Sequence, residues 1–143
     1  MIFNAQERLS DQQAITATAA STNAIDLQAT GTVYGAAAAI SRDIGPGEPI
    51  PLLIQVTEDF ATLTSLDIQL ELDSTESFTP DAVVDIAMAV PVAQLVAGYK
   101  LPYTIVPNDV NLRYARLKYT VNGSNATAGK ITAGIVAGVQ TNG

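Results

Sequence analysis

The middle of the chain alternates strictly between apolar and polar residues. Over residues 66–73, aliphatic side chains occupy every second position, and acidic or amide side chains fill the positions between them. A period of two places the aliphatic side chains on one face of a β-strand and the polar ones in water. Residues 81–90 continue with the same period. The side chains predicted to face the core in these two strands are Leu66, Ile68, Leu70 and Leu72, then Val84, Ile86, Met88 and Val90.

Two further segments carry the same strand pattern. Residues 50–57 form one, and Pro51 fits the beginning or the edge of a strand because it has no amide hydrogen to donate. Residues 115–121 form the other, with small and large apolar side chains at every second position. This strand is predicted to end at a turn formed by Asn122 and Gly123.

Residues 130–140 predict a fifth strand, in which Gly134 and Gly138 leave room for another backbone to approach closely. Weaker patterns raise the total to as many as eight strands, and Pro91–Ala97 has the start and stop signals of one helical turn. Short alternating strands at even spacing are typical of an all-β, single-domain β-sandwich or barrel. The three weaker strand candidates are residues 24–28, 32–41 and 99–106.

Residues 1–22 differ from the rest of the chain, because neither a helical nor a strand period persists across them. Residues 6–14 could form a short helical turn. The segment could be a frayed terminus, or an extended N-terminal arm that becomes ordered on a partner. We therefore divide the chain into an arm over 1–22 and a sandwich domain over 23–143. The arm's isolated apolar side chains, which would contact the partner, are Phe3, Leu9 and Ile15.

Composition and charge narrow the function classes. The chain has 143 residues, which suits one domain, and its formal net charge of −7 disfavours both nucleic acid and membrane surfaces as partners. It contains no Cys, His or Trp, so zinc-finger sites, thiol nucleophiles and Ser-His-Asp triads are excluded. We expect no cofactor and no metal. The N-terminus has no secretion signal, and we expect the protein to be made in the cytoplasm of the cell that produces it.

Carboxylates along residues 67–76 are the remaining candidates for chemistry. Their oxygens could hold calcium, but no calcium-binding loop motif is present and strand alternation alone explains their spacing. They could also form the carboxylate pair of a glycosidase, as could Glu58 with Asp59. Glu58 and Asp59 are adjacent and therefore point to opposite faces of a strand, and the chain has few aromatic residues to hold a sugar. We therefore interpret the stripe Asp67, Glu71, Asp73 and Glu76 as a solvated face and expect no enzymatic activity.

Tyr114, Arg116 and Lys118 share the polar face of the strand over residues 115–121. Tyr and Arg are enriched at protein interfaces, so these residues are a candidate contact surface. The more ordinary interpretation is cross-strand pairing with an acidic neighbour such as Asp67 or Glu71.

Four segments carry a distinctive layout of strands and turns, namely Thr18–Leu27, Leu95–Pro102, Arg113–Val121 and Ala128–Val136. Together they resemble the jelly-roll cement, or decoration, proteins of tailed bacteriophages. The resemblance extends from about Ser10 to Gln140 and rests on the layout of strands and turns. It implies a jelly-roll β-sandwich and carries no catalytic or metal-binding residues over to this chain.

The resemblance also implies a structural role on the outer surface of an HK97-type capsid in the virion. Such a protein binds the major capsid protein, assembles with itself as a homodimer or a homotrimer, and staples neighbouring capsomers against internal DNA pressure. A homodimer located on the local twofold axes of the capsid is the favoured arrangement. An acidic, cysteine-free sandwich suits the outside of a shell, away from packaged DNA. The alternative is a receptor- or glycan-binding module of a phage tail or fibre.

Overall fold

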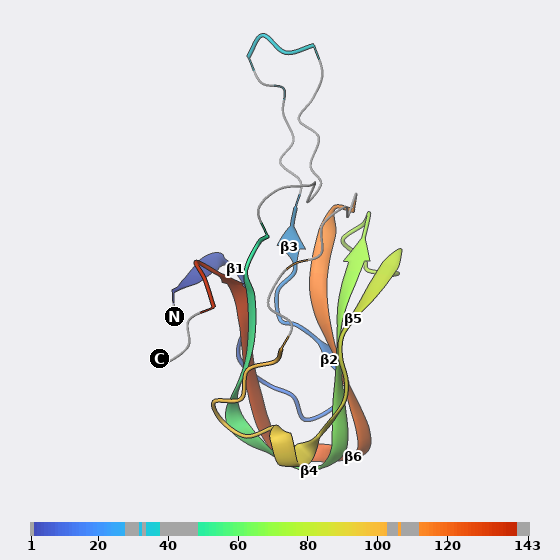
Figure 1. Ribbon diagram of the computed structural model, residues 1–143. Coiled ribbons are helices and arrows are strands. Elements are labelled where there is room, and N and C mark those ends of the chain that lie inside the picture. The colour runs from blue at the N-terminus through green and yellow to red at the C-terminus, as the bar shows by residue number, and fades with distance from the viewer. Residues whose placement is uncertain are drawn as a thin grey trace.

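Strands make up nearly all of the regular structure in residues 2–27, 32, 34–37, 49–102, 106 and 112–139, which are the residues that this computed structural model describes. The described strands form one antiparallel sheet of six strands, and the prediction of an all-β single domain is confirmed (Figure 1). The elements are β1 (Phe3–Ala14), β2 (Ala19–Ala20), β3 (Ile25–Asp26), β4 (Leu52–Asp73), β5 (Ala82–Pro91), the 3-10 helix η1 (Val92–Gln94) and β6 (Tyr114–Val136).

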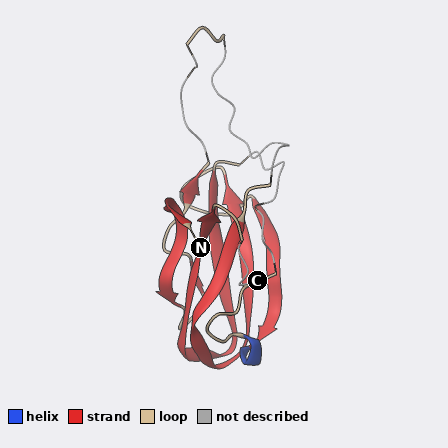
Figure 2. Cartoon of the chain, turned by 60° about the vertical axis from the view of Figure 1, so that its left-hand side comes forward, coloured by secondary structure: helices blue, strands red, loops and turns tan. Residues whose placement is uncertain are grey.

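Strands β4 and β6 pair along almost their whole length and bend together. Their register runs from Leu52 opposite Ile135 to Asp73 opposite Tyr114, with shifts between Val56 and Ser65 of β4. Both strands curve at one end of the body and return along it (Figure 1). Helix η1 lies at the same end, as Figure 2 shows. The bends fold the single sheet into two facing layers.

The first layer contains β1, the second half of β6, the first half of β4 and the backbone around residue 100. Strand β1 pairs with β6 from Phe3 opposite Val136 onward. On the other side of β4, the amide of Val56 donates to the carbonyl of Tyr99 at 2.9 Å, and the amide of Leu101 donates to the carbonyl of Ile54 at 3.0 Å. Residues 99–101 of the candidate strand over 99–106 thus pair with β4, and the amide of Val106 donates to the carbonyl of Ile50 just before it.

The second layer contains β2 with β3, the first half of β6, the second half of β4, and β5. Strands β2 and β3 pair with β6, and β5 pairs with β4. In chain order the first extended segment therefore pairs with the last, the second with the next to last, and so on inward to the β4–β5 pair. This nested pairing across two layers is the connectivity of a jelly roll.

The core lies between the two layers. Leu66, Ile68, Leu70 and Leu72 are all buried, as the alternation predicted. Tyr119 of β6 is also fully buried, and its hydroxyl shares a 2.8 Å hydrogen bond with Ser10 Oγ of β1. A buried phenol needs such a partner, because an unsatisfied hydroxyl in an apolar interior is destabilising.

Asn122 and Gly123 do not end a strand, so the predicted turn is wrong. They lie inside β6, at its bend. Gly123 has a φ of +86°, and a Cβ there would stand 2.2 Å from Thr64 Oγ1 of β4. Glycine meets both demands, because it adopts positive φ freely and lets a neighbouring chain come close. The sequence signal of a hairpin is here the signal of a bend within a long strand.

Residues 3–14 are not an extended arm, nor do residues 6–14 form a helical turn. They form β1, hydrogen-bonded to β6, and they carry Leu9 and Ser10 into the interior. Ile15, directly after β1, is fully buried as well. Burial of apolar surface is the dominant stabilising term in folding, so this segment is part of the sandwich from Phe3 onward.

Strand β5 departs from the predicted alternation at Met88. Two register shifts against β4, on either side of Ile68, each add one residue to β5. Ile86 and Val90 are buried, whereas Met88 is 50% exposed. The shifts move Met88 off the core face, and the prediction for this residue is therefore wrong.

The predictions for the helical turn, for Gly134 and Gly138, and for residues 32–41 have different outcomes. The helical turn after Pro91 is confirmed as η1. A Cβ at Gly134 would meet the backbone of Arg8 at 2.8 Å, which confirms close approach of a backbone, whereas nothing lies within 4 Å of the same position at Gly138. Most of the candidate strand over 32–41 lies outside the described residues.

Candidate interaction surface

The apolar residues predicted to anchor an arm belong to the body of the molecule. Leu9 is 1% exposed and Ile15 is fully buried, so neither can reach a partner from this fold. Phe3, at the start of β1, is partly exposed, and the guanidinium carbon of Arg8 lies 5.5 Å from the centre of its ring. The arm hypothesis is wrong because Leu9 and Ile15 complete the core of their own chain.

Arg116 is engaged within the chain. Its Nε donates to Glu71 Oε2 at 2.6 Å, across the register that places Glu71 opposite Arg116. Its guanidinium carbon also lies 4.2 Å from the ring centre of Phe78, which follows β4 in the loop before β5. Phe78 in turn meets Tyr114 edge to face, with ring centres 6.2 Å apart. Cross-strand pairing of Arg116 with an acidic neighbour is therefore confirmed, with Glu71 as the neighbour.

Arg113 and Lys118 lie next to this cluster and differ in their contacts. Arg113 donates to both carboxylate oxygens of Asp26, at 3.1 and 2.9 Å, and this hydrogen bonding raises the pKa of its guanidinium. Lys118 lies in register with Gln69 and forms no ion pair with any described residue. Tyr114, Arg116 and Lys118 thus share one outer face, but only Lys118 keeps its charge uncommitted.

The acidic stripe is less solvated than predicted. Glu71 is 8% exposed and Asp73 is 1% exposed, so both carboxylates are buried. Asp73 Oδ1 accepts hydrogen bonds from the amide and hydroxyl of Thr75, and Asp67 accepts one from the amide of Ala89 at 2.7 Å. Among the described residues, no three carboxylates are grouped closely enough to hold a metal ion.

Glu58 and Asp59, the other candidate carboxylate pair, each have a partner. The ammonium of Lys130 donates to Glu58 Oε2, and this hydrogen bond lowers the pKa of Glu58. Asp59 accepts the amide of Ala97 at 2.7 Å. Both carboxylates therefore make contacts within the chain near the bend of the sheet.

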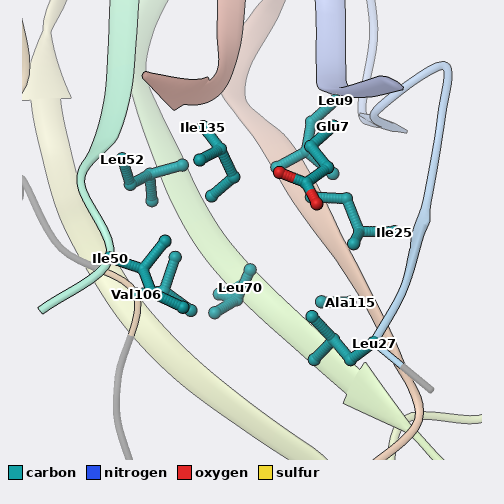
Figure 3. Close-up of a pocket in the computed structure, with 10 residues that line it drawn as sticks. All are labelled: Glu7, Leu9, Ile25, Leu27, Ile50, Leu52, Leu70, Val106, Ala115 and Ile135. Carbon is teal, nitrogen blue, oxygen red and sulfur yellow. The ribbon is translucent and has the colours of Figure 1, made fainter. Parts of the chain in front are cut away.

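A cavity lies between the two layers and is lined by side chains from both (Figure 3). Its volume is about 60 Å³, well below the ~300 Å³ at which ordinary small-molecule pockets begin. The carboxylate of Glu7 points toward an otherwise apolar wall, as Figure 3 shows. The space suits water or one small apolar group. Its lining residues are Glu7, Leu9, Ile25, Leu27, Ile50, Leu52, Leu70, Val106, Ala115 and Ile135.

The outer face of β5 presents apolar side chains to solvent. Val83 is 47% exposed and Met88 is 50% exposed, with Asp85 between them on the same face. Sequence reasoning missed this surface. Val83 could have been found, since strict alternation points it outward, but the shifts that turn Met88 outward leave no periodic signal.

A family model for Bbp16 matches residues 9–135. The chain belongs to the Bbp16 family. This family is associated with phages. The search of curated proteins found no match to the chain.

The Bbp16 match spans both layers of the sandwich. It begins at Leu9 within β1 and ends at Ile135, one residue before the end of β6. These two strands are the outermost pair of the nested jelly roll. The family relationship therefore covers the complete fold, including part of the N-terminal segment that sequence patterns had set apart. Among the described residues, no helix is long and apolar enough to cross a membrane.

Proposed function

We propose that this protein is a capsid cement protein, which binds the outer surface of an HK97-type phage shell and staples neighbouring capsomers. The observation that carries the proposal is membership of the phage-associated Bbp16 family over residues 9–135. The resemblance of the same stretch to jelly-roll decoration proteins supplies the specific role. The location is the outside of the virion, after synthesis in the host bacterium.

The charge of the chain supports a position outside the shell. Fourteen acidic residues against seven basic ones give a net charge of −7, and packaged DNA repels such a body. Four of the basic residues are also neutralised within the chain, in the ion pairs of Arg8, Arg113, Arg116 and Lys130. Few cations remain to contact phosphate, which supports a protein partner over nucleic acid.

The fold determines how such a staple would work. Residues 3–15 are built into the sandwich, so the contacts to the shell come from the surface of the body and not from a free arm. A homodimer would present the same contact surface twice. Two linked contacts on neighbouring capsomers bind more tightly than either contact alone, and holding both capsomers resists their separation.

The direct test is to add the purified protein to expanded, DNA-free capsids that lack it. We expect cosedimentation with the capsids and a rise in the temperature at which the shells rupture. An acidic β-domain of similar size from an unrelated protein serves as the control. If the protein instead leaves capsids unoccupied and binds host-cell glycans, it is a receptor-binding module of a tail or fibre, and the cement proposal is wrong.

A further inference from the structure

Strand β5 forms one edge of the second layer. It pairs with β4 and with no other strand among the described residues. Its inward side chains pack on the core, and none of the described strands covers its second edge. Val83, Asp85 and Met88 follow one another along that face.

The exposure of two large apolar side chains here follows from the register of β5. Val83 lies on the outer face beside Glu71, where a polar residue would satisfy folding equally well. The register shifts that bring Met88 outward are β-bulges, which commonly re-aim a side chain near a functional surface. Apolar centres surrounded by polar rims are the usual anatomy of protein interfaces.

An acidic rim formed by Asp81 and Asp85 accompanies these apolar side chains. Asp85 lies between Val83 and Met88 in the sequence, and Asp81 immediately precedes β5. Both are exposed, and neither forms an ion pair with a described residue. Asp81 Oδ2 accepts the amide of Ser74, and Gln69 donates to Asp85 Oδ1 at 2.7 Å, so neither contact neutralises the negative charge.

The negative charge of this rim determines which kind of partner can bind the outer face of β5. A second copy of the chain docked through the same face would set acidic rims against each other, and like charges across an interface are strongly unfavourable. Nucleic acid and anionic lipid are repelled for the same reason. The complementary partner is a protein surface with an apolar socket bordered by Lys or Arg.

We propose that the outer face of β5, with Val83 and Met88 as anchors and Asp81 and Asp85 as rim, docks on a basic patch of the shell subunit. This inference rests on the proposed function, because it names the shell as the partner. It adds which face of the sandwich meets the shell and which chemistry recognises it. Self-association of the protein then uses a different surface.

The test compares two matched sets of variants on expanded capsids. The double variant Val83→Ser with Met88→Gln should raise the Kd for capsids at least tenfold, because buried anchors dominate interface energies. Val96→Ser is its control, since Val96 is also 47% exposed but lies outside β5. Asp85→Lys should weaken capsid binding most at low salt, where charge attraction is least screened. Asp11→Lys, an equal charge change on β1, should not.

The outcomes separate this inference from the proposed function. Thermal melts first establish that each variant is folded. If the wild type binds capsids and the β5 variants bind equally well, the docking face is wrong while the cement role stands. If the β5 variants change the sedimentation of the free protein and not its capsid affinity, a second copy occupies the face and the inference is overturned. If the wild type does not bind capsids, both proposals fail.

Discussion

Individual carboxylates in this molecule are distinguished by their partners more than by their place in a strand pattern. Glu71 and Asp85 both occupy outward positions of the second layer. Glu71 is buried and held by Arg116, whose guanidinium lies over Phe78, whereas Asp85 remains in solvent. Alternation assigns a side chain to a face, but the side chains around it decide whether it is exposed. The outer face of this layer thus carries both a structural ion pair and an exposed acidic rim.

The ion pair of Glu58 with Lys130 predicts a pH dependence of stability. The Lys130 hydrogen bond lowers the pKa of Glu58 in the folded state, so the unfolded chain takes up the proton first. The stabilisation is therefore complete above the unfolded pKa of about 4.3 and is lost as the pH falls through the lower folded value. Melting temperatures of the wild type and Glu58→Gln should differ at pH 6–7 and converge toward pH 3. On a Lys130→Met background, a gap that persisted at neutral pH would contradict this assignment.

Gly134 and Gly138 offer a matched pair for testing the contact between β1 and β6. A Cβ at Gly134 would stand 2.8 Å from the Cα of Arg8 and 2.9 Å from the carbonyl oxygen of Glu7, so backbone must move. We expect Gly134→Ala to destabilise the fold by roughly 1–3 kcal/mol, as overpacking does. Gly138→Ala meets nothing within 4 Å and should change stability by less than about 0.5 kcal/mol. Denaturant unfolding of both variants measures the difference, and equal effects would mean that β1 does not lie against Gly134.

At the scale of whole elements, the sequence indicates the inner strands far better than the edges. The second half of β4 alternates clearly because one face is buried along its whole length. Strand β1 has three register shifts against β6, and Gln12 within it has a φ of 46°, so no period survives to be recognised. The bend of β6 looks like a hairpin turn in the sequence, because glycine is favoured both in such turns and in a bend within a strand. Pairing of Arg116 with Glu71 followed from alternation, but the exposed face of β5 depends on bulges that have no sequence period.

The role of β1 can be tested by removing it. Deleting residues 2–14 removes Leu9 from the core, leaves Tyr119 without its Ser10 partner and exposes the edge of β6. Loss of one buried leucine alone costs about 2–5 kcal/mol, a large part of the 5–15 kcal/mol that stabilises an ordinary domain. We expect the truncated chain to be unfolded or aggregated by circular dichroism and size-exclusion chromatography. Ile2→Ser is the control, because Ile2 is 72% exposed and should be dispensable.

A truncated chain that kept the melting temperature of the full protein would support the hypothesis of a separate N-terminal arm. Residues 1–22 would then be separable from the sandwich, and Phe3, Leu9 and Ile15 would again be candidates for contacts with the shell. The structure gives the opposite expectation, because β1 is the partner of the last strand in the nested pairing.

At the scale of the whole molecule, the two layers are not independent units. Strands β4 and β6 each pass through both layers, and their mutual pairing extends from Leu52 opposite Ile135 in one to Asp73 opposite Tyr114 in the other. Neither layer can therefore unfold without breaking strands of the other. If the protein is the capsid cement that we propose, force between its two layers would pass through continuous hydrogen-bonded backbone.

This continuity predicts a single cooperative unfolding transition. Far-ultraviolet circular dichroism reports the strands of both layers, and near-ultraviolet circular dichroism reports the packing of tyrosines, among them the buried Tyr119 that bonds to Ser10 of β1. The two probes should give the same midpoint in denaturant, as two-state domains of this size do. Gly134→Ala perturbs the first layer directly, yet it should lower both midpoints together because β4 and β6 carry the loss into the second layer. Separate midpoints, in the wild type or in this variant, would show that the bends uncouple the layers.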